Sequence, residues 1–377
     1  MPSTLMLLSN PYRPDPRVLI EARALILEGI DVNLVAWDRE QTWPKRATED
    51  GIQVLRLGPK CPPREAAKIL LRLPRFWLGA LKARKRINFD VVHSHDFDTL
   101  PLGRLISRLS GKPLLYDAHE LYAKMVQNEV GPIWRLIWWL EKICASQTDS
   151  TITVSDELAA ELPTSRSGKA TVVSTTQDPS VIGGSDVGEI RRKYGLDGFV
   201  VSYLGSLEPG RFVEETISAF VPEDGLTVLV AGSGTLAGKV EETARSSKVV
   251  KYIGVVPPDE ALRLTLASDL VVAMMDPGNL NNVVGTPGKI INAMAVGRPL
   301  ITTRGLNIAT KVEDAGCGLV VPWSKADFRG AVIKARANRA STAEMGIKGK
   351  AYYDQHFSWN RSREGLLKAY RALIPPS

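Results

Sequence analysis

Apolar and polar residues follow two rhythms along the chain: short apolar runs, and longer segments with apolar residues at helical spacing. Residues 3–9 form the first apolar run. Asp15 and Pro16 then predict the N-cap and the first turn of a helix, and Gly29 predicts its end. Between these limits the apolar positions repeat at the spacing of one helix face: Val18, Ala22, Leu25 and Ile26.

Further short runs, apolar along their length and polar at their ends, predict the strands of two sheets. In the first half they span residues 31–37, 52–57, 89–96, 112–120, 150–156 and 170–174. In the second half they span residues 198–206, 226–234, 249–255, 268–276 and 298–304. Because helical segments separate many of these runs, we expect an α/β protein with two doubly wound parallel sheets, each covered by helices on both faces.

Residues 164–188 interrupt this rhythm with one short apolar run and then a stretch rich in Gly, Ser, Asp and Pro, which is typical of a linker. We therefore predict a first domain over residues 1–178 and a second over residues 186–358. A helix with one apolar face follows over residues 359–377. Ligands of doubly wound sheets bind beyond the carboxyl ends of the strands, so the polar residues there, facing a cleft between the domains, are the candidates for function.

The composition narrows the class of protein. Of 377 residues, 44% are hydrophobic and 24% are charged, which excludes a disordered or fibrous chain. No apolar run approaches the roughly 20 residues that span a bilayer, and the N-terminus lacks the features of a signal peptide. Three separated cysteines form no disulfide framework, so we expect a cytoplasmic protein. The net charge of +7 permits an anionic partner without identifying it.

Three of the four histidines fall at the ends of two neighbouring predicted strands. His93 and His95 end one strand, and His119, followed by Glu120, ends the next. Asp96 follows His95 directly. Three interpretations are open: capping or core histidines, a zinc site, or contact of His95 or His119 with a ligand. Acidic neighbours could set the pKa and the orientation of His119 in each case.

Two glycine-containing loops of the second half each precede a predicted helix and carry a cation. One runs from Gly205 to Arg211, and the other from Gly285 to Lys289. Helix N-termini with nearby cations bind phosphate groups well. Neither loop is a Walker A motif, and no Gly-x-Gly-x-x-Gly follows the first strand, which disfavours a nicotinamide-type enzyme. Together these features indicate an enzyme that acts on a phosphorylated, nucleotide-activated ligand.

The chain resembles the retaining GT-B glycosyltransferases of family 4 (glycosyl transferases group 1). The similar stretches are residues 9–39, 89–103, 114–122, 151–159, 200–220, 228–235, 252–273 and 285–303, with the closing helix at residues 357–370. The resemblance implies two Rossmann-like domains that face a central cleft. It also implies that the closing helix packs back on the first domain and that the second domain holds the nucleotide-sugar donor.

The resemblance assigns roles to individual residues. His119, Arg211 and Lys289 are expected to contact the transferred sugar and the donor diphosphate during catalysis. Donor-binding positions are Gly205, Ser206, Arg211, Gly232, Thr286, Gly288, Lys289, Ile290 and Asn292. Positions expected to face the acceptor and the cleft are Asp15, Arg17, His95, Asp96 and Glu120. The chain departs from the family pattern at three of its positions: Val284 and Asn292 replace a pair of glutamates, and Ser206 replaces an arginine.

The family mechanism retains the anomeric configuration, and the leaving diphosphate helps to deprotonate the acceptor. Positioning and charge stabilisation by Arg211, Lys289 and helix dipoles then suffice, so we expect no metal and no cofactor. The expected activity is transfer of a hexose-type sugar from a nucleotide-diphosphate donor to a lipid-linked or polysaccharide acceptor. The alternatives are a GT-B nucleotide-sugar epimerase or hydrolase, and a catalytically silent GT-B binding subunit, which the missing glutamates would favour.

Two segments suggest where the protein works. Residues 62–88 interleave leucines and aromatic residues with many cations against the single acid Glu65. This composition suits the face of an anionic membrane. Residues 133–140 are rich in tryptophan, as interfacial anchors are. The alternative is an ordinary covering helix at both places. No nucleic-acid-binding module is recognisable, so we expect no nucleic-acid partner.

Overall fold

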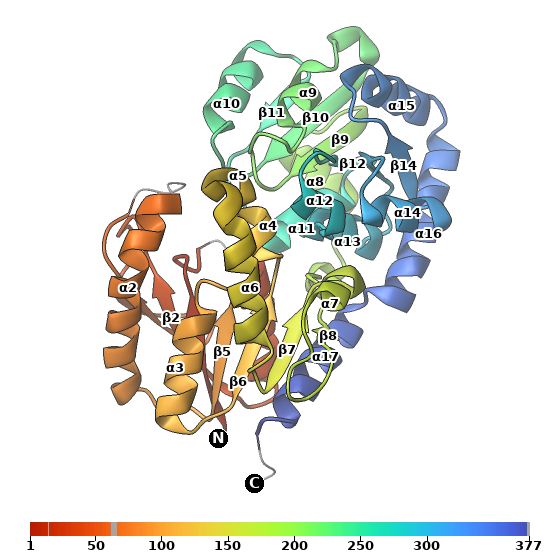
Figure 1. The fold of residues 1–377 in the computed structure, drawn as a ribbon. Coiled ribbons are helices and arrows are strands. Elements are labelled where there is room, and N and C mark those ends of the chain that lie inside the picture. Colours follow the sequence, from red (N-terminus) through yellow and green to blue (C-terminus); the bar gives the residue numbers. More distant parts are fainter. Residues whose placement is uncertain (14, 62–65, 375–377) are drawn as a thin grey trace. The chain divides into compact units, whose positions relative to one another are not determined.

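The computed structural model describes residues 1–13, 15–61 and 66–374 and divides the chain into two compact units (Figure 1). The first unit comprises Met1–Ser174 together with Asn360–Ser377, and the second comprises Thr175–Trp359. The linker predicted from composition therefore belongs to the second unit, where a short 3-10 helix, η3 (Pro179–Ile182), and the start of α8 (Val187–Tyr194) occupy it. Residues 62–65 of the predicted membrane-facing segment, which include Glu65, lie outside the described residues.

The first unit is built on an eight-stranded sheet with the order β3-β4-β2-β1-β5-β6-β7-β8. Every pairing is parallel except the one between β3 and β4. The strands are β1 (Ser3–Leu8), β2 (Asp31–Trp37), β3 (Arg46–Glu49), β4 (Ile52–Leu57), β5 (Val91–His95), β6 (Leu114–Ala118), β7 (Ser150–Thr153) and β8 (Thr171–Val172). The sequence pattern missed β3 because this edge strand, partly exposed, has no apolar run.

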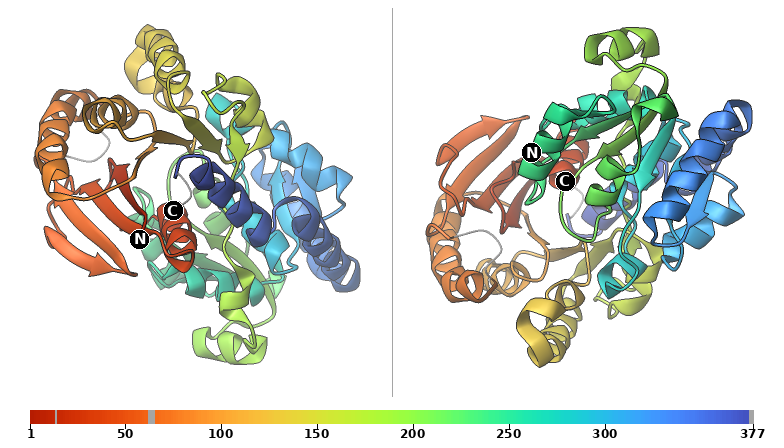
Figure 2. Two further views of the ribbon diagram at one scale, coloured as in Figure 1. Left: turned by 90° about the horizontal axis from the view of Figure 1, so that it is seen from below. Right: turned by 90° about the horizontal axis from the view of Figure 1, so that it is seen from above.

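Helices cover both faces of this sheet (Figures 1 and 2). One face carries α1 (Pro16–Leu27) and, beside it, the closing helix α17 (Trp359–Arg371), whose Arg363 pairs with Glu28 at the end of α1. The other face carries α2 (Ala66–Ala83), α3 (Leu100–Ser110) and α6 (Trp134–Ala145). Shorter helices complete the unit: η1 (Arg84–Arg86), α4 (Tyr122–Met125), α5 (Gln127–Val130), η2 (Gly131–Ile133) and α7 (Asp156–Glu161).

The start of α1 shows how the sequence encodes this arrangement locally. Asp15 is the N-cap, and its carboxylate accepts the backbone N–H of Val18 at 3.1 Å. Pro16 occupies the first helical position, where no N–H is needed. Val18, Ala22 and Leu25 are buried, as their spacing predicts. The helix therefore begins at the carboxyl edge of the sheet with Arg17 in its first turn.

The second unit is built on a six-stranded, fully parallel sheet with the order β11-β10-β9-β12-β13-β14. Its strands are β9 (Phe199–Leu204), β10 (Leu226–Ala231), β11 (Val250–Tyr252), β12 (Leu270–Ala273), β13 (Leu300–Thr303) and β14 (Gly318–Val321). The strand β14 was not predicted, although its residues Leu319, Val320 and Val321 form a short apolar run.

The two faces of this sheet bury separate apolar clusters. The covering helices are α8, α9 (Val213–Ser218), α10 (Ala237–Ser246), α11 (Pro258–Leu266), α12 (Leu280–Val284), α13 (Gly288–Ala295), α14 (Asn307–Asp314), α15 (Lys325–Ala337) and α16 (Arg339–His356), with the short 3-10 helix η4 (Pro222–Asp224). Within the described ranges no helix is long and apolar enough to cross a membrane. Cys61, Cys144 and Cys317 are all buried and unpaired.

Candidate functional site

Asp117 is the centre of a charged cluster at the carboxyl edge of the first sheet. It lies near the end of β6 with its side chain fully buried. The guanidinium of Arg17 reaches it from α1 and donates from Nε at 2.9 Å and from Nη2 at 2.5 Å to the two carboxylate oxygens. Burial would raise the pKa of Asp117, but the charges of Arg17 and His119 hold this pKa well below its usual range. Asp117 is therefore ionised and firmly paired.

His119 lies between two carboxylates. Its Nε2 contacts Asp117 Oδ2 at 2.6 Å, and its Nδ1 lies 3.3 Å from Asp96 Oδ2. Asp96 also accepts the backbone N–H of His119 at 3.2 Å. Burial would lower the pKa of His119, but the two carboxylates raise this pKa well above its ordinary value. The ring is therefore a cation in a fixed orientation, and its side chain keeps 16% of its surface exposed.

The other two histidines of this cluster, His93 and His95, are more deeply buried, together with Glu21. His95 Nδ1 contacts Asp117 Oδ2 at 3.2 Å, and His93 Nδ1 contacts the hydroxyl of Tyr370 at 2.9 Å. Burial lowers the pKa of both histidines, so both rings are neutral. Burial also raises the pKa of Glu21 to about 8, although Arg17 Nη2 lies 3.0 Å from its carboxylate. The nearby negative charge of Asp117 adds to the effect of burial and raises the pKa of Glu21 further.

These side chains also bear on the zinc interpretation. Glu21, His93, His95 and Asp117 offer ligand atoms that all lie within 4.8 Å of one another. Both oxygens of Asp117, however, accept hydrogen bonds from Arg17. A guanidinium thus already neutralises the anionic member of the set. The arrangement corresponds better to the interpretation of core histidines, with His119 at the edge of the cluster.

The structure separates the predicted residues of the first unit into two groups. His119, Asp96, Asp15 and Glu120 are partly exposed and remain candidates for contact with a ligand. Arg17 and His95 are 6% and 0% exposed and contact Asp117, so contact of these two residues with an acceptor stays a prediction. Both are drawn inward by Asp117, whose buried charge needs partners. Sequence reasoning did not single out Glu21 or Tyr370. The spacing of Arg17 and Glu21, one turn apart on an apolar helix, was the available signal.

In the second unit, two glycine loops interlock at the carboxyl edge of the sheet. Gly205 follows β9 with φ of 137°, and Gly232 follows β10 with φ of 143°. A Cβ atom at Gly232 would lie 1.8 Å from the carbonyl oxygen of Gly205. Gly232 is therefore required for the close packing of the two loops. Gly205 lies near Lys289, one of the residues predicted to bind the donor, since a Cβ atom at Gly205 would lie 3.7 Å from Cε of Lys289.

Lys289 stands in the first turn of α13, and its ammonium has no hydrogen-bond partner among the described residues. Its Nζ is shielded from solvent and lies 3.8 Å from the centre of the Tyr203 ring. Burial, helped by the charge of Arg211, lowers the pKa of Lys289 to about 7. On the same face of the helix, three residues further on, Asn292 Oδ1 is also buried without a partner. An unpaired cation and an unpaired amide oxygen are thus buried side by side on one helix.

Arg211 lies close enough to Lys289 to disfavour its charge, and it has no carboxylate partner among the described residues. Its Nη1 donates to the thioether sulfur of Met275 at 2.7 Å. Met275 follows β12, and its backbone N–H is held by the Thr303 hydroxyl. A thioether is a weak acceptor and neutralises no charge. The arrangement of Arg211 and Lys289 therefore suits a bound anion.

The other predicted donor residues are placed as follows. Gly288 opens α13, and Thr286 lies two residues before it; both are partly buried. The carbonyl of Ser206 accepts the hydroxyl of Tyr203 at 2.7 Å. Ile290 is corrected: its side chain is fully buried in the core, and its N–H donates to Pro287 at 3.0 Å. The predicted helix after Arg211 is α9, which has six residues and begins after Phe212.

Two doubly wound α/β units with charged side chains at their strand ends define the GT-B class of glycosyltransferases. Solved structures confirm the fold. A sucrose-phosphate synthase from Thermosynechococcus elongatus superposes with a TM-score of 0.79 at 17% identity over 99% of both chains. HepE from Anabaena, in complex with UDP-glucose, superposes with a TM-score of 0.72 at 16% identity over 98% of this chain and 100% of the other.

Sequence comparison gives the family. Residues 17–180 match Glycosyltransferase Family 4, and residues 198–338 match Glycosyl transferases group 1. A D-inositol 3-phosphate glycosyltransferase from Acidothermus cellulolyticus is 25% identical over 93% of this chain and 83% of its own length. The chain belongs to the family 4 glycosyltransferases and is a transferase enzyme, as the resemblance predicted.

Proposed function

We propose that the protein moves a hexose-type sugar from a nucleotide-diphosphate donor to a lipid-linked or glycan acceptor, with retention of configuration. The observation that carries this proposal is the pair of cations at Lys289 and Arg211, which no carboxylate among the described residues neutralises. A diphosphate supplies the missing negative charge. The UDP-glucose complex of HepE, which shares the fold, supports a nucleotide sugar as the donor.

In this proposal the second unit stabilises the leaving group. Arg211 and Lys289 neutralise the charge that develops on the diphosphate, and the N-terminus of α13 adds its dipole. Asn292 replaces a glutamate of the family pattern, and its buried, unpartnered Oδ1 can accept a hydrogen bond from a donor hydroxyl. Because two cations already meet the diphosphate charge, we propose that turnover requires neither a metal nor a cofactor.

In the first unit we propose that His119 contacts the transferred sugar. Its charge and orientation are set by Asp117 and Asp96, and its partly exposed ring can meet a polar ligand. Asp15, Asp96 and Glu120 are the remaining partly exposed candidates for acceptor contact. Arg17 and His95 act indirectly: they contact Asp117 and fix its position, and Asp117 in turn orients His119.

The donor role is tested by calorimetric titration with a panel of UDP-, GDP- and ADP-sugars. Arg211→Ala is expected to weaken binding of the best donor by about 1–3 kcal/mol, the range for a lost hydrogen bond to a charged group. Arg245→Ala is the matched control, because Arg245 is exposed and pairs only with Glu241 on α10. Unchanged affinity in Arg211→Ala would remove Arg211 from the phosphate role.

Transfer itself is tested by release of free nucleotide from the bound donor. If the proposal is right, a membrane extract that contains acceptors stimulates release, and the sugar appears on a glycan or lipid product. Release without a glycosylated product would favour a hydrolase, and conversion of the donor sugar an epimerase. Absence of binding to every donor in the panel would favour a silent binding subunit. Product anomer analysis by NMR tests retention.

A further inference from the structure

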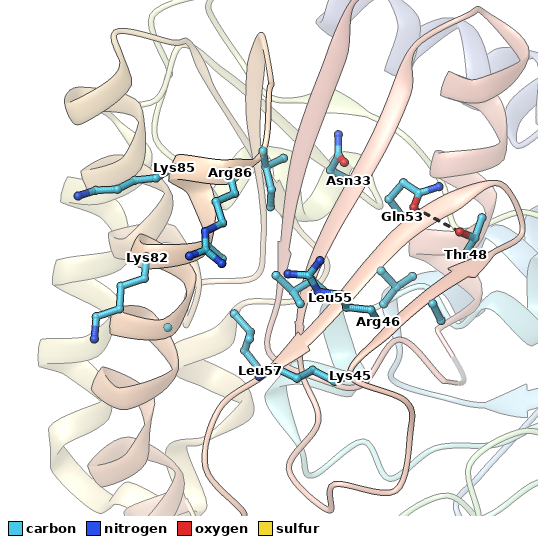
Figure 3. A pocket seen from close by; sticks show the side chains of 15 residues that line it. Asn33, Lys45, Arg46, Thr48, Gln53, Leu55, Leu57, Lys82, Lys85 and Arg86 are labelled. Carbon is cyan, nitrogen blue, oxygen red and sulfur yellow. Dashed lines mark hydrogen bonds between the residues drawn. The ribbon is translucent and has the colours of Figure 1, made fainter.

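A second site opens in the first unit, away from the residues described above (Figure 3). A pocket of about 1080 Å³ lies between the edge hairpin β3–β4 and the end of α2 with η1. Asn33 and Gln53, near the amino ends of β2 and β4, line it, as do Leu55 and Leu57 further along β4. The charged cluster around Asp117 lies at the opposite, carboxyl ends of the parallel strands. No residue of that cluster lines this pocket.

The charge of this basic pocket is one-sided. Five cations line it, and no aspartate or glutamate does: Lys45, Arg46, Lys82, Lys85 and Arg86. None of the five forms an ion pair within the described part of the chain, whereas Arg56 on the same hairpin pairs with Glu49 at 2.8 Å. The guanidinium groups of Arg46 and Arg86 point toward the space between the hairpin and η1 from its two sides (Figure 3). Such a set of uncompensated cations attracts an anion.

Exposed apolar side chains lie on α2, the helix whose C-terminal part lines the basic pocket. Leu71 and Leu78 of α2 are 79% and 57% exposed. Their spacing of seven residues places them on one face of the helix, and Lys82 follows Leu78 by one turn on that face. The described part of α2 contains no acidic residue. α3 packs between α2 and α6 (Figure 1). Both α3 and α6 add exposed apolar residues: Leu105 and Leu109 on α3, and Leu136 and Trp139 on α6.

We propose that the basic pocket binds the phosphate of an anionic phospholipid headgroup and so attaches the first unit to a bilayer. Arg46 and Arg86 clasp the phosphate, for which planar guanidinium groups are well suited. Leu71 and Leu78 enter the boundary of the acyl chains, and the lysines at the rim meet neighbouring headgroups. A lipid is favoured over a soluble phosphate because exposed leucines border the cations. It is favoured over nucleic acid because no aromatic residue lines the pocket for base stacking.

This inference goes beyond the proposed function, because attachment to a bilayer requires no sugar donor. It also makes the predicted membrane role of residues 62–88 specific. The pocket uses the C-terminal part of that segment together with the β3–β4 hairpin, which the sequence pattern did not connect with it. In this proposal the Trp-rich helix α6 also contacts the bilayer, through its exposed Leu136 and Trp139.

The test is co-sedimentation of the full chain with vesicles of phosphatidylcholine, with or without phosphatidylglycerol. We expect pelleting only with the anionic vesicles, weakened by added salt. The double variant Arg46→Gln/Arg86→Gln should lower the partition coefficient roughly 10- to 30-fold, since each cation near an anionic surface contributes about fivefold. Leu71→Ser should also lower it, without a folding risk, because this side chain is exposed.

The matched control is Arg245→Gln/Lys348→Gln, which removes the same charge from exposed positions of the second unit. An equal loss of vesicle binding in this control would overturn the role of the basic pocket, because binding would then depend only on the net charge of the protein. Equal pelleting with neutral and anionic vesicles would overturn the electrostatic role. Binding of free glycerol phosphate as tight as binding to vesicles would assign the pocket to a soluble anion instead. Binding of the donor panel to the double variant should be unchanged, which separates this inference from the proposed function.

Discussion

The two units handle buried charge in opposite ways. In the first unit the guanidinium of Arg17 meets Asp117 through two hydrogen bonds, and His119 shares the same carboxylate. Among the described residues of the second unit, the buried ammonium of Lys289 has no hydrogen-bond partner, and the side chain of the nearby Arg211 hydrogen-bonds only to the sulfur of Met275. One cluster neutralises itself, whereas the other leaves positive charge uncompensated.

This difference separates a structural role from a binding role. A buried ion pair loses stability when one partner is removed, because the other charge is left without compensation. A buried cation without a partner already lowers the stability of the folded protein, and a ligand that supplies the counter-charge removes this unfavourable free energy. Loss of a side chain should therefore lower stability in the first cluster and donor affinity in the second. The following experiments test this contrast, from the largest expected effect to the smallest.

Removal of the central cation of the first cluster should have the largest effect. Arg17→Met leaves the Asp117 charge buried without its main partner, so unfolding in urea should show a loss of about 3–5 kcal/mol. The control is Arg166→Met, whose partner Asp149 is bound at the surface at 2.8 Å. That exposed pair should cost no more than about 1 kcal/mol. Equal losses in the two variants would break the comparison.

Removal of the central cation of the second cluster should act on binding. Lys289→Met should weaken the best nucleotide sugar by about 1.5–3 kcal/mol, as expected for a hydrogen bond to a charged group. Its stability in urea should be equal to or above that of the parent, because the variant no longer buries an unpaired ammonium. Lys348→Met, at an exposed position of α16, controls for charge. A large loss of stability in Lys289→Met would show that Lys289 serves the fold.

The pH dependence of donor binding sharpens the assignment of Lys289. Since its pKa is lowered to about 7, the free enzyme loses this charge as the pH rises, and the bound diphosphate restores it. A nucleotide sugar has no phosphate that titrates in this range, so affinity should fall roughly fivefold between pH 7 and pH 8, with uptake of almost one proton at pH 8. Calorimetry in buffers of different ionisation enthalpy measures the uptake. The effect should vanish in Lys289→Met.

The same group should affect stability with a defined sign. Above pH 7 the folded protein releases the Lys289 proton, while the unfolded chain keeps its proton up to the ordinary pKa of lysine. The unfolded state then binds more protons, so this group makes the folded state more stable as the pH rises through that window. Urea unfolding of parent and Lys289→Met across the window isolates the contribution. A contribution that falls with pH would contradict the lowered pKa.

The smallest effect is expected at Glu21. Because burial raises the pKa of Glu21 to about 8, this side chain is neutral at pH 7, and Glu21→Gln should change stability by no more than about 1 kcal/mol. As the pH rises from the ordinary pKa of glutamate to about 8, the folded parent holds a proton that the unfolded chain lacks, so parent stability falls. The variant should lack this slope. A large loss at pH 7 would instead identify an ionised Glu21 paired with Arg17.

Much of the fold could be predicted from local sequence. Apolar runs located most strands, Asp15 and Pro16 located the start of α1, and polar strand ends located the edges where charged side chains gather. The strand β3 escaped prediction because its pairing with β4, not its own apolar content, makes it a strand. The strand β14 was missed although Leu319, Val320 and Val321 form a short apolar run.

The candidate site divides in the same way. The sequence by itself determined which residue types stand at the strand ends, including His119, Arg211 and Lys289, because strand and loop periods are local properties. Only the tertiary structure decided that Arg17 and His95 turn inward to Asp117 and that Lys289 has no partner. Pairing and burial depend on side chains from distant parts of the chain, as the contact of Arg17 with Asp117 shows. A local sequence pattern therefore cannot predict with which cation a buried carboxylate forms an ion pair.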